Sequence, residues 1–197
     1  MEQQETLDSR QSQVLTIRDR ASVSVPTRQA MRAVATAWDA LMAGEERGLE
    51  HVRPSIRASW ARSQRLGVNP YLPGLPVVLA AEELEALQEP ADLLAVAPPL
   101  FEAVVTTWRD EPFIITLSDL RGRILHTNGH PRVLERAREL NAVPGGSMAE
   151  EYIGTATANA VLTSGQAEYV LWSEHYCQML HGWAGLGVPV LTLPPMS

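Results

Sequence analysis

The sequence contains no lysine: all sixteen basic residues are arginine. Without lysine, a phosphate-binding loop of the G-x-x-x-x-G-K-[ST] type cannot be completed. The single cysteine, Cys177, cannot form an internal disulfide, which fits a reducing compartment. No apolar run approaches the roughly 18 residues that cross a bilayer, and the polar start lacks the pattern of a secretory signal. We therefore expect a cytoplasmic protein with no membrane contact.

Charge is distributed unevenly along the 197 residues, whose formal net charge is −7. Residues 1–70 hold ten arginines against eight acidic residues, whereas residues 71–197 hold six against fifteen. Neutralisation of phosphates supplies most of the nonspecific affinity of proteins for DNA, and an acidic domain supplies little of it. We expect no direct nucleic acid contact by this chain.

Residues suited to catalysis or metal binding are few. A zinc site needs about four ligands at set spacings, whereas the sequence offers one cysteine and five scattered histidines. His175 and Cys177 would share one side of a strand, but no third orienting group or oxyanion element accompanies them. We expect no enzyme, no metal and no cofactor.

The first 90 residues indicate helices rather than strands. Residues 1–24 are polar and are expected to be flexible, and residues 25–90 are expected to form a helical N-terminal region. Within that region, apolar residues recur at helical spacing from Thr27 to Ala43 and again from Arg53 to Leu66. A third, short amphipathic helix is predicted from Ala80 to Gln88.

A broad apolar stripe runs at helical spacing from Ala91 to Trp108. Pro98 and Pro99 interrupt it, so two helical segments or a kink are expected. Such a stripe forms the core of a monomer or the interface of a homodimer, and the sequence favours neither. Trp60, on the second of the earlier helices, is either a core residue or part of a partner or nucleic-acid surface, and the burial habits of aromatic residues favour the core.

The second half of the sequence alternates strands with short helices. Phe113–Leu117 and Arg123–Thr127 are apolar or β-branched and are joined by a turn with Gly122, which indicates a hairpin. Further elements are expected in this order: helices over residues 131–140 and 154–163, and a strand from Glu168 to Trp172. We predict an α+β fold in which helices pack on an antiparallel sheet.

Four short motifs occur in a characteristic order. They are RPSIRASWARS from Arg53 to Ser63, LSDLRGRIL from Leu117 to Leu125, Glu150 with Gly154-Thr155, and Glu174-His175-Tyr176. Together they resemble the N-terminal sensory region of acetoin-catabolism-type transcriptional activators, which are sigma-54-dependent (Fis-type) regulators with a GAF sensor. The resemblance spans roughly residues 53–189.

The resemblance implies a GAF-like antiparallel sheet flanked by helices, with residues 91–197 as the sensor domain. The family's closing strand is missing after Pro189, and neither an ATPase domain nor a helix-turn-helix follows, so a truncated sensor is expected. The sequence departs from the family's pattern at several positions: Ser63 replaces a cysteine, Met148-Ala149 replace Trp-Ser, Ala156 replaces an asparagine and Asn159 replaces a glycine.

The function that the resemblance implies is signal sensing. Such a domain binds a small-molecule effector and relays it, through a shift between two states, to DNA-binding or polymerase-activating domains outside this chain. The implied pocket residues are Thr116, His126, Thr155, Asn159, Trp172, His175 and Tyr176. In the alternative, neighbouring groups satisfy these side chains, the pocket is vestigial, and the chain is a dimerisation or interaction module. A homodimer is expected in either case.

Overall fold

The computed structural model describes residues 26–85 and 91–190 of the chain. The predicted flexible segment, residues 1–24, lies outside these ranges. The short helix predicted from Ala80 to Gln88 is found as α4 (Ala81–Glu85), and its last predicted residues also lie outside. Within the described ranges, no helix is both long enough and apolar enough to cross a membrane.

The two predicted N-terminal helices are confirmed as α2 (Arg28–Met42) and α3 (Pro54–Arg65), with the short 3-10 helix η1 (Leu49–His51) between them. The hydroxyl of Thr27 caps α2, accepting a hydrogen bond from the Ala30 amide at 3.2 Å. Pro54 starts α3, where the amide proton that proline lacks would have no helical acceptor.

The apolar stripe forms one continuous helix, α5 (Ala91–Thr107), although Pro98 and Pro99 lie inside it. The predicted alternative of two separate segments is therefore wrong. A proline within a helix removes a backbone hydrogen bond and crowds the preceding turn. Packing offsets this penalty, because one face of α5, including Ala97 and Phe101, lies against the hairpin that follows.

The predicted hairpin is confirmed as β1 (Ile114–Ser118) and β2 (Ile124–Gly129), which pair antiparallel. Its turn is held by the side chain of Asp119, whose Oδ1 accepts hydrogen bonds from the amides of Arg121 and Arg123, both at 2.9 Å. A short acidic side chain that bonds backbone two residues further on is a common turn-forming device.

Three of the remaining elements were predicted, and they occur in the predicted order: α6 (Pro131–Glu139), α8 (Thr157–Ser164) and β3 (Glu168–Leu171). Four were not predicted: α7 (Glu150–Ile153), the 3-10 helices η2 (Trp172–Glu174) and η3 (Gln178–Leu180), and β4 (Ala184–Gly187). The helix predicted from Gly154 begins only at Thr157. Gly154 has a φ of +64° and Ala156 is extended, so neither residue has helical geometry.

The described strands form two separate antiparallel sheets of two strands each, β1–β2 and β3–β4. The α+β class is confirmed, but the single sheet that the sequence predicted is not found among the described residues. β1 is hydrogen-bonded to β2 and β3 to β4, and no strand pairing among the described residues connects the two sheets.

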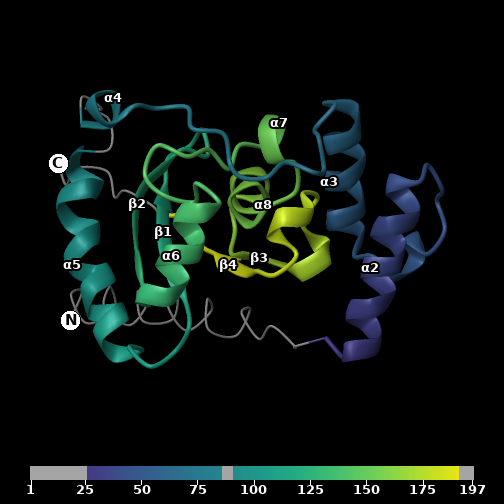
Figure 1. Ribbon diagram of the computed structural model, residues 1–197, viewed down its shortest axis with the longest axis horizontal. Helices are drawn as coiled ribbons and strands as arrows, with labels where there is room; N and C mark the ends of the chain where they lie inside the picture. The colour runs from purple at the N-terminus through teal and green to yellow at the C-terminus, as the bar shows by residue number, and fades with distance from the viewer. Residues whose placement is uncertain (1–25, 86–90, 191–197) are drawn as a thin grey trace, which may run out of the picture.

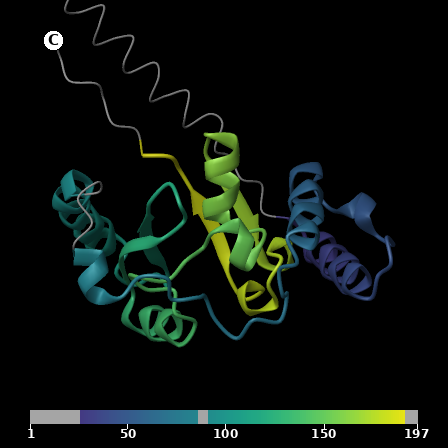
Figure 2. The same ribbon diagram turned by 90° about the horizontal axis from the view of Figure 1, so that it is seen from above.

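The hydrophobic core has two parts. The larger cluster joins residues of α2 and α3, such as Trp38 and Trp60, to Ile124, Ile153 and Val170 of the later elements. It therefore crosses the predicted domain boundary at residue 90. The smaller cluster lies between α5 and the β1–β2 hairpin. Figures 1 and 2 show α5 at one end of the molecule and α2 with α3 at the other, with the sheets, α6 and α8 between them.

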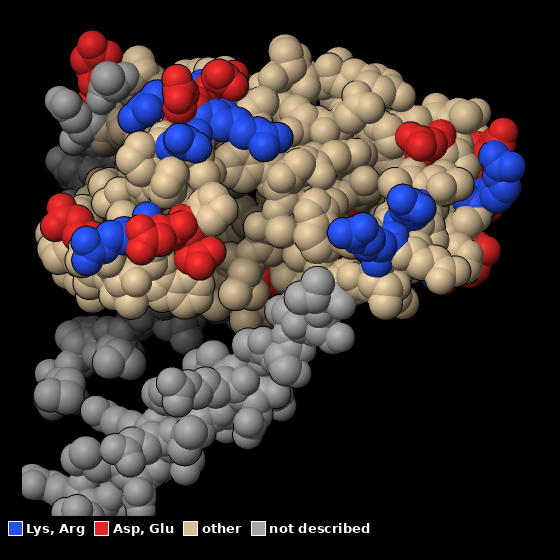
Figure 3. Space-filling view, turned by 60° about the horizontal axis from the view of Figure 1, so that its bottom comes forward, with Lys and Arg blue, Asp and Glu red and all other residues tan. Residues whose placement is uncertain are grey.

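Charged side chains gather at the two ends of the face shown in Figure 3. Basic and acidic side chains are interspersed at these ends, and the middle of this face is uncharged. No continuous basic strip crosses it, whereas DNA-binding surfaces usually carry one.

Candidate functional site

Arg53, the residue before α3, binds Glu174 at the end of η2. Arg53 Nε donates to Glu174 Oε1 at 2.7 Å, and Nη2 donates to Oε2 at 2.8 Å. Nη2 also donates to the carbonyl of Tyr169 at 2.8 Å, and the guanidinium carbon lies 3.9 Å from the centroid of the Tyr169 ring. Two parallel hydrogen bonds between arginine and a carboxylate fix orientation as well as distance.

The electrostatic setting of this pair favours its charged form. Burial alone would lower the pKa of the Arg53 guanidinium, but the hydrogen bonds and negative charge of Glu174 outweigh burial and raise that pKa above its ordinary value. Glu174 is buried, and its Oε2 also accepts from the Leu171 amide at 2.9 Å. Removing Arg53 would leave a buried carboxylate without its counter-ion, which is strongly destabilising.

Two buried tryptophans hold the segment from Glu174 to Tyr176. Trp60 Nε1, on α3, donates to the Glu174 carbonyl at 2.8 Å. Trp38 Nε1, on α2, donates to the Tyr176 carbonyl at 2.9 Å. A buried indole N–H usually needs such a partner. Both N-terminal helices therefore contact the same short segment through a buried tryptophan.

A second set of polar contacts lies along α3. Thr155 Oγ1 donates to Ser59 Oγ at 2.7 Å, and Ser59 Oγ donates to Glu150 Oε1 at 3.0 Å. Arg62 completes the set, because its Nη2 lies 2.8 Å from the same Glu150 oxygen. We call the two sets together the α3 interface: Arg53, Ser59, Trp60 and Arg62 on one side, and Glu150, Thr155 and Glu174 on the other.

The backbone around Gly154 is fitted to α3. A Cβ at position 154 would lie 2.5 Å from Ser63 Oγ and 2.8 Å from the Cβ of Tyr176, so only glycine fits there. The carbonyl of Gly154 accepts a hydrogen bond from the side-chain amide of Asn159 on α8. Asn159 therefore has a structural partner inside the fold.

His175 is buried, and its Nδ1 lies 2.9 Å from the Trp172 carbonyl. Burial lowers the pKa of the imidazole to about 4, opposed by that hydrogen bond and assisted by nearby His181. His181 Nε2 in turn lies 3.1 Å from the His175 carbonyl, and burial lowers its pKa as well. Both rings are neutral at pH 7.

Cys177 is completely buried, and its Sγ donates to the Asn69 carbonyl at 3.4 Å. Burial raises the pKa of the thiol to about 12, so it is protonated at neutral pH and is a poor nucleophile. Throughout the described ranges, no group of three or more His, Cys, Asp or Glu side chains is placed to hold a metal ion.

The seven predicted pocket residues fall into two separate groups. Thr116 and His126 lie on the β1–β2 hairpin, where Thr116 pairs with Thr127. Neighbours on a strand point to opposite faces, so Thr116 and His126 also face opposite sides. The other five lie near the α3 interface: Thr155, Asn159, Trp172, His175 and Tyr176. Of these five, Thr155, Asn159 and His175 direct their side chains to partners within the fold.

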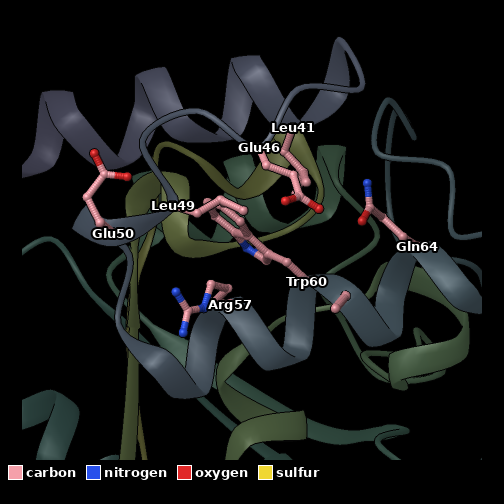
Figure 4. A pocket seen from close by; sticks show the side chains of 8 residues that line it. Leu41, Glu46, Leu49, Glu50, Arg57, Trp60 and Gln64 are labelled. Atoms are coloured by element: carbon pink, nitrogen blue, oxygen red, sulfur yellow. The ribbon is translucent and has the colours of Figure 1, made fainter.

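Two hollows on the surface of the described residues are lined by none of these seven. A groove of about 530 Å³ lies between α2 and α3, with Trp60 and Leu49 in its floor and Glu46, Glu50 and Arg57 on its rim (Figure 4). A more open hollow of about 600 Å³ lies beside the end of α5.

Sequence reasoning missed the pairing at the α3 interface. Arg53 and Glu174 both occur in the quoted motifs, but they are 121 residues apart, and nothing local marks them as partners. One signal was available: Arg53 lies in the first and Glu174 in the last of the four ordered motifs.

Comparison with known proteins identifies relatives of the chain. The family described as the MimR N-terminal domain matches residues 32–194. The acetoin dehydrogenase operon transcriptional activator AcoR of Bacillus subtilis is 31% identical over 140 residues, covering 71% of this chain and 23% of that protein. The propane 2-monooxygenase operon transcriptional activator MimR of Mycolicibacterium goodii is 29% identical over 143 residues, with the same coverage.

A 47.3 kDa protein from the thcA 5′ region of Rhodococcus erythropolis is 30% identical over 140 residues, covering 71% of this chain and 32% of the relative. The chain thus spans a third or less of the length of these relatives. A similar fold occurs in the crystal structure of the E. coli DhaR(N)–DhaL complex, with a TM-score of 0.66 and 24% identity, covering 70% of this chain and 47% of that one.

Proposed function

The chain belongs to the MimR N-terminal domain family, and we propose that it is the signal-receiving domain of a transcriptional activator. Its relatives are transcriptional activators, which supports a regulatory role over an enzymatic one. In this proposal the later elements receive the signal, and α2 and α3 pass it to domains outside this chain. We further propose that the sensor is GAF-like, with its antiparallel strands divided between the two sheets described above.

The α3 interface is the observation that carries this proposal. It links the N-terminal helices to the end of β3 through the bidentate contact of Arg53 with Glu174 and the indole of Trp60. A displacement of the segment around Glu174 must therefore break these contacts or move α3. In this proposal the domain has a second arrangement in which these contacts are changed, and the signal shifts the population between the two.

A small-molecule effector is part of the proposal, and His126 is the residue that supports it. Its Nε2 is buried and has no hydrogen-bond partner among the described residues, and the ring lies 5.3 Å from that of Phe101 on α5. Buried polar atoms are normally paired. A small ligand with a hydroxyl or carbonyl group would supply the missing partner.

The second candidate is a dimerisation module with a vestigial pocket. The observation that favours it is the internal pairing of Thr155, Asn159 and His175, because one polar group of each side chain is bonded to a partner within the fold. In that case the helices would carry the function, and partner binding would replace effector binding.

Thermal-shift and calorimetric screening with small alcohols, ketones and aromatic compounds tests the first candidate. We expect a saturable rise in Tm that His126→Gln abolishes and that Leu120→Ala, on the exposed hairpin turn, does not. Relay through the α3 interface predicts a ligand-induced change in tryptophan fluorescence that Arg53→Met removes while binding persists. Absence of any saturable shift, in a folded dimeric protein, would favour the second candidate.

A further inference from the structure

Trp172, the residue between β3 and the rest of η2, has a backbone conformation that its side chain disfavours. Its φ is +46°, and among the described residues other than glycine only Asn141 also has a positive φ. Asparagine tolerates the left-handed region because its short polar side chain can bond the local backbone, whereas a bulky aromatic residue there is an outlier. Strain of this kind persists only where the surrounding structure enforces it, and it is concentrated in functional and switching segments. Contacts around Trp172 must therefore hold it in place.

The left-handed turn at Trp172 ends the pairing of β3 with β4 halfway through a residue pair. The register of the two strands places Leu171 opposite Ala184, and hence Trp172 opposite Trp183. The Trp172 amide donates to the Trp183 carbonyl at 2.8 Å, as it would in a continuing ladder. In a complete antiparallel pair of this kind the two residues exchange both hydrogen bonds. Here the Trp183 amide donates instead to the Leu180 carbonyl, at 2.9 Å.

The carbonyl of Trp172 is bonded to His175. It accepts from the His175 amide at 3.0 Å, and His175 Nδ1 lies 2.9 Å from the same oxygen. Glu174 closes the turn, since its Oε2 accepts at 2.9 Å from the amide of the residue before Trp172. The same carboxylate is held by Arg53, and the Glu174 carbonyl accepts from the indole of Trp60. Two side chains of the α3 interface, Arg53 and Trp60, therefore hold the strained turn closed.

We propose that Trp172 is the hinge of the second arrangement in which the α3 interface is changed, an inference that rests on the function proposed above. When the contact between Arg53 and Glu174 is released, residue 172 becomes extended. Its carbonyl then accepts from the Trp183 amide, so the residue pair is completed and β3 lengthens by one residue. Relief of the strain favours this arrangement and the α3 contacts oppose it. A signal that weakens those contacts therefore shifts the population through one element-terminal residue.

Glycine and alanine at position 172 report the backbone conformation there, because the two residues differ only by the Cβ. A Cβ is disfavoured at a positive φ, whereas in a strand alanine is preferred to glycine. We expect the unfolding equilibrium constant of Trp172→Gly, measured by urea denaturation, to be about fivefold smaller than that of Trp172→Ala. Leu171, with a φ of −118°, is the matched control, and there the alanine variant should be the more stable of the two.

Arg53→Met tests whether the α3 interface holds the turn. In that background the hinge is released, so the advantage of glycine over alanine at position 172 should disappear or reverse. The order of the two variants at position 171 should stay as it is. An unchanged advantage of glycine in the Arg53→Met chain, or no advantage of glycine in the chain that keeps Arg53, would each overturn the proposal.

Nuclear magnetic resonance tests the hinge with the indole of Trp172 in place. The three-bond coupling between the amide and α protons of a residue depends on its φ. We expect this coupling for Trp172 to rise in Arg53→Met toward that of a strand residue, and to be unchanged in Arg47→Met, which removes only a surface ion pair. An equal coupling in both variants would overturn the proposal. None of these measurements needs an effector, so a saturable ligand found without a hinge would refute this inference and leave the sensing proposal standing.

Discussion

Gly154 lies directly against Ser63, and a Cβ at position 154 would come within 2.5 Å of the Ser63 hydroxyl oxygen. Gly154 has a φ of +64°, and Gly165 has nearly the same value, +65°, with no atom within 4 Å of the position of its missing Cβ. The two glycines share a positive φ but differ in ψ: Gly154 has a ψ of −140°, in a region that essentially only glycine adopts, whereas Gly165 has a ψ of +16° and is left-handed helical.

Gly154→Ala should lower the free energy of unfolding more than Gly165→Ala. At position 165 a left-handed alanine costs about 1 kcal/mol. At position 154 the backbone conformation is essentially restricted to glycine, so an alanine there is strained by about 1–3 kcal/mol. Overpacking against Ser63 adds about 1–3 kcal/mol at position 154 only. Urea denaturation of the two variants measures the difference, and equal losses would contradict the close fit of α3 to this turn.

Arg53→Met should reduce the free energy of unfolding by about 2–4 kcal/mol, because it leaves the Glu174 carboxylate buried without its counter-ion. Arg47→Met is the matched control. Arg47 pairs with Glu45 at 3.2 Å on the surface, where the two side chains are 75% and 54% exposed, and such pairs contribute little. If chemical denaturation gives the two variants the same free energy of unfolding, the Arg53–Glu174 pair of the α3 interface does not stabilise the fold.

The protein should lose stability as the pH falls below about 6.5, the ordinary pKa of histidine. The folded-state pKa of His175 is lowered to about 4, so between these values the unfolded chain binds a proton that the folded protein does not. At pH 5 this difference amounts to about 2 kcal/mol. Burial also lowers the pKa of His181, which acts in the same direction.

Denaturant titrations from pH 7 to pH 5 measure this dependence. His175→Asn should flatten it, since asparagine can still donate to the Trp172 carbonyl but does not titrate. His51→Gln is the control, because His51 is exposed and pairs only with Glu50 on the surface, so its pH dependence should match the unaltered chain. An unchanged slope in His175→Asn would show that another group is responsible.

Cys177 should resist thiol reagents in the native protein. Its pKa of about 12 and its complete burial leave almost no accessible thiolate at pH 7. Labelling with a coloured disulfide reagent should be slow in buffer and rapid in denaturant, which exposes the same thiol. Prompt stoichiometric labelling without denaturant would contradict the packing around Asn69 and Cys177.

The sequence predicted those elements whose ends carry local signals. Thr27 caps α2, Pro54 starts α3 and the Asp119 turn joins the hairpin, and each of these acts within a few residues. Prediction from the sequence failed where packing between distant segments decides whether an element continues or ends. The two prolines of α5 indicate a break, but the contact of that helix with the hairpin keeps it whole.

The candidate site was less predictable than the fold. The motifs identified Glu150, Thr155 and Glu174 as notable, and the structure places all three against α3. Their partners are 88 to 121 residues away, and no periodicity connects positions so far apart. The side chain of Asn159 was predicted to face a ligand, whereas it bonds the Gly154 carbonyl, because a buried backbone acceptor needs a donor.

The prolines of α5 have a consequence for its dynamics. Proline has no amide proton, so the carbonyl oxygens of Leu94 and Ala95 receive no donor from Pro98 and Pro99, four residues further along. The first turns of α5 are therefore joined to the rest by fewer bonds than the ribbon suggests. We expect deuterium to replace amide protons sooner before Pro98 than after Leu100, so that one geometrical helix opens as two units.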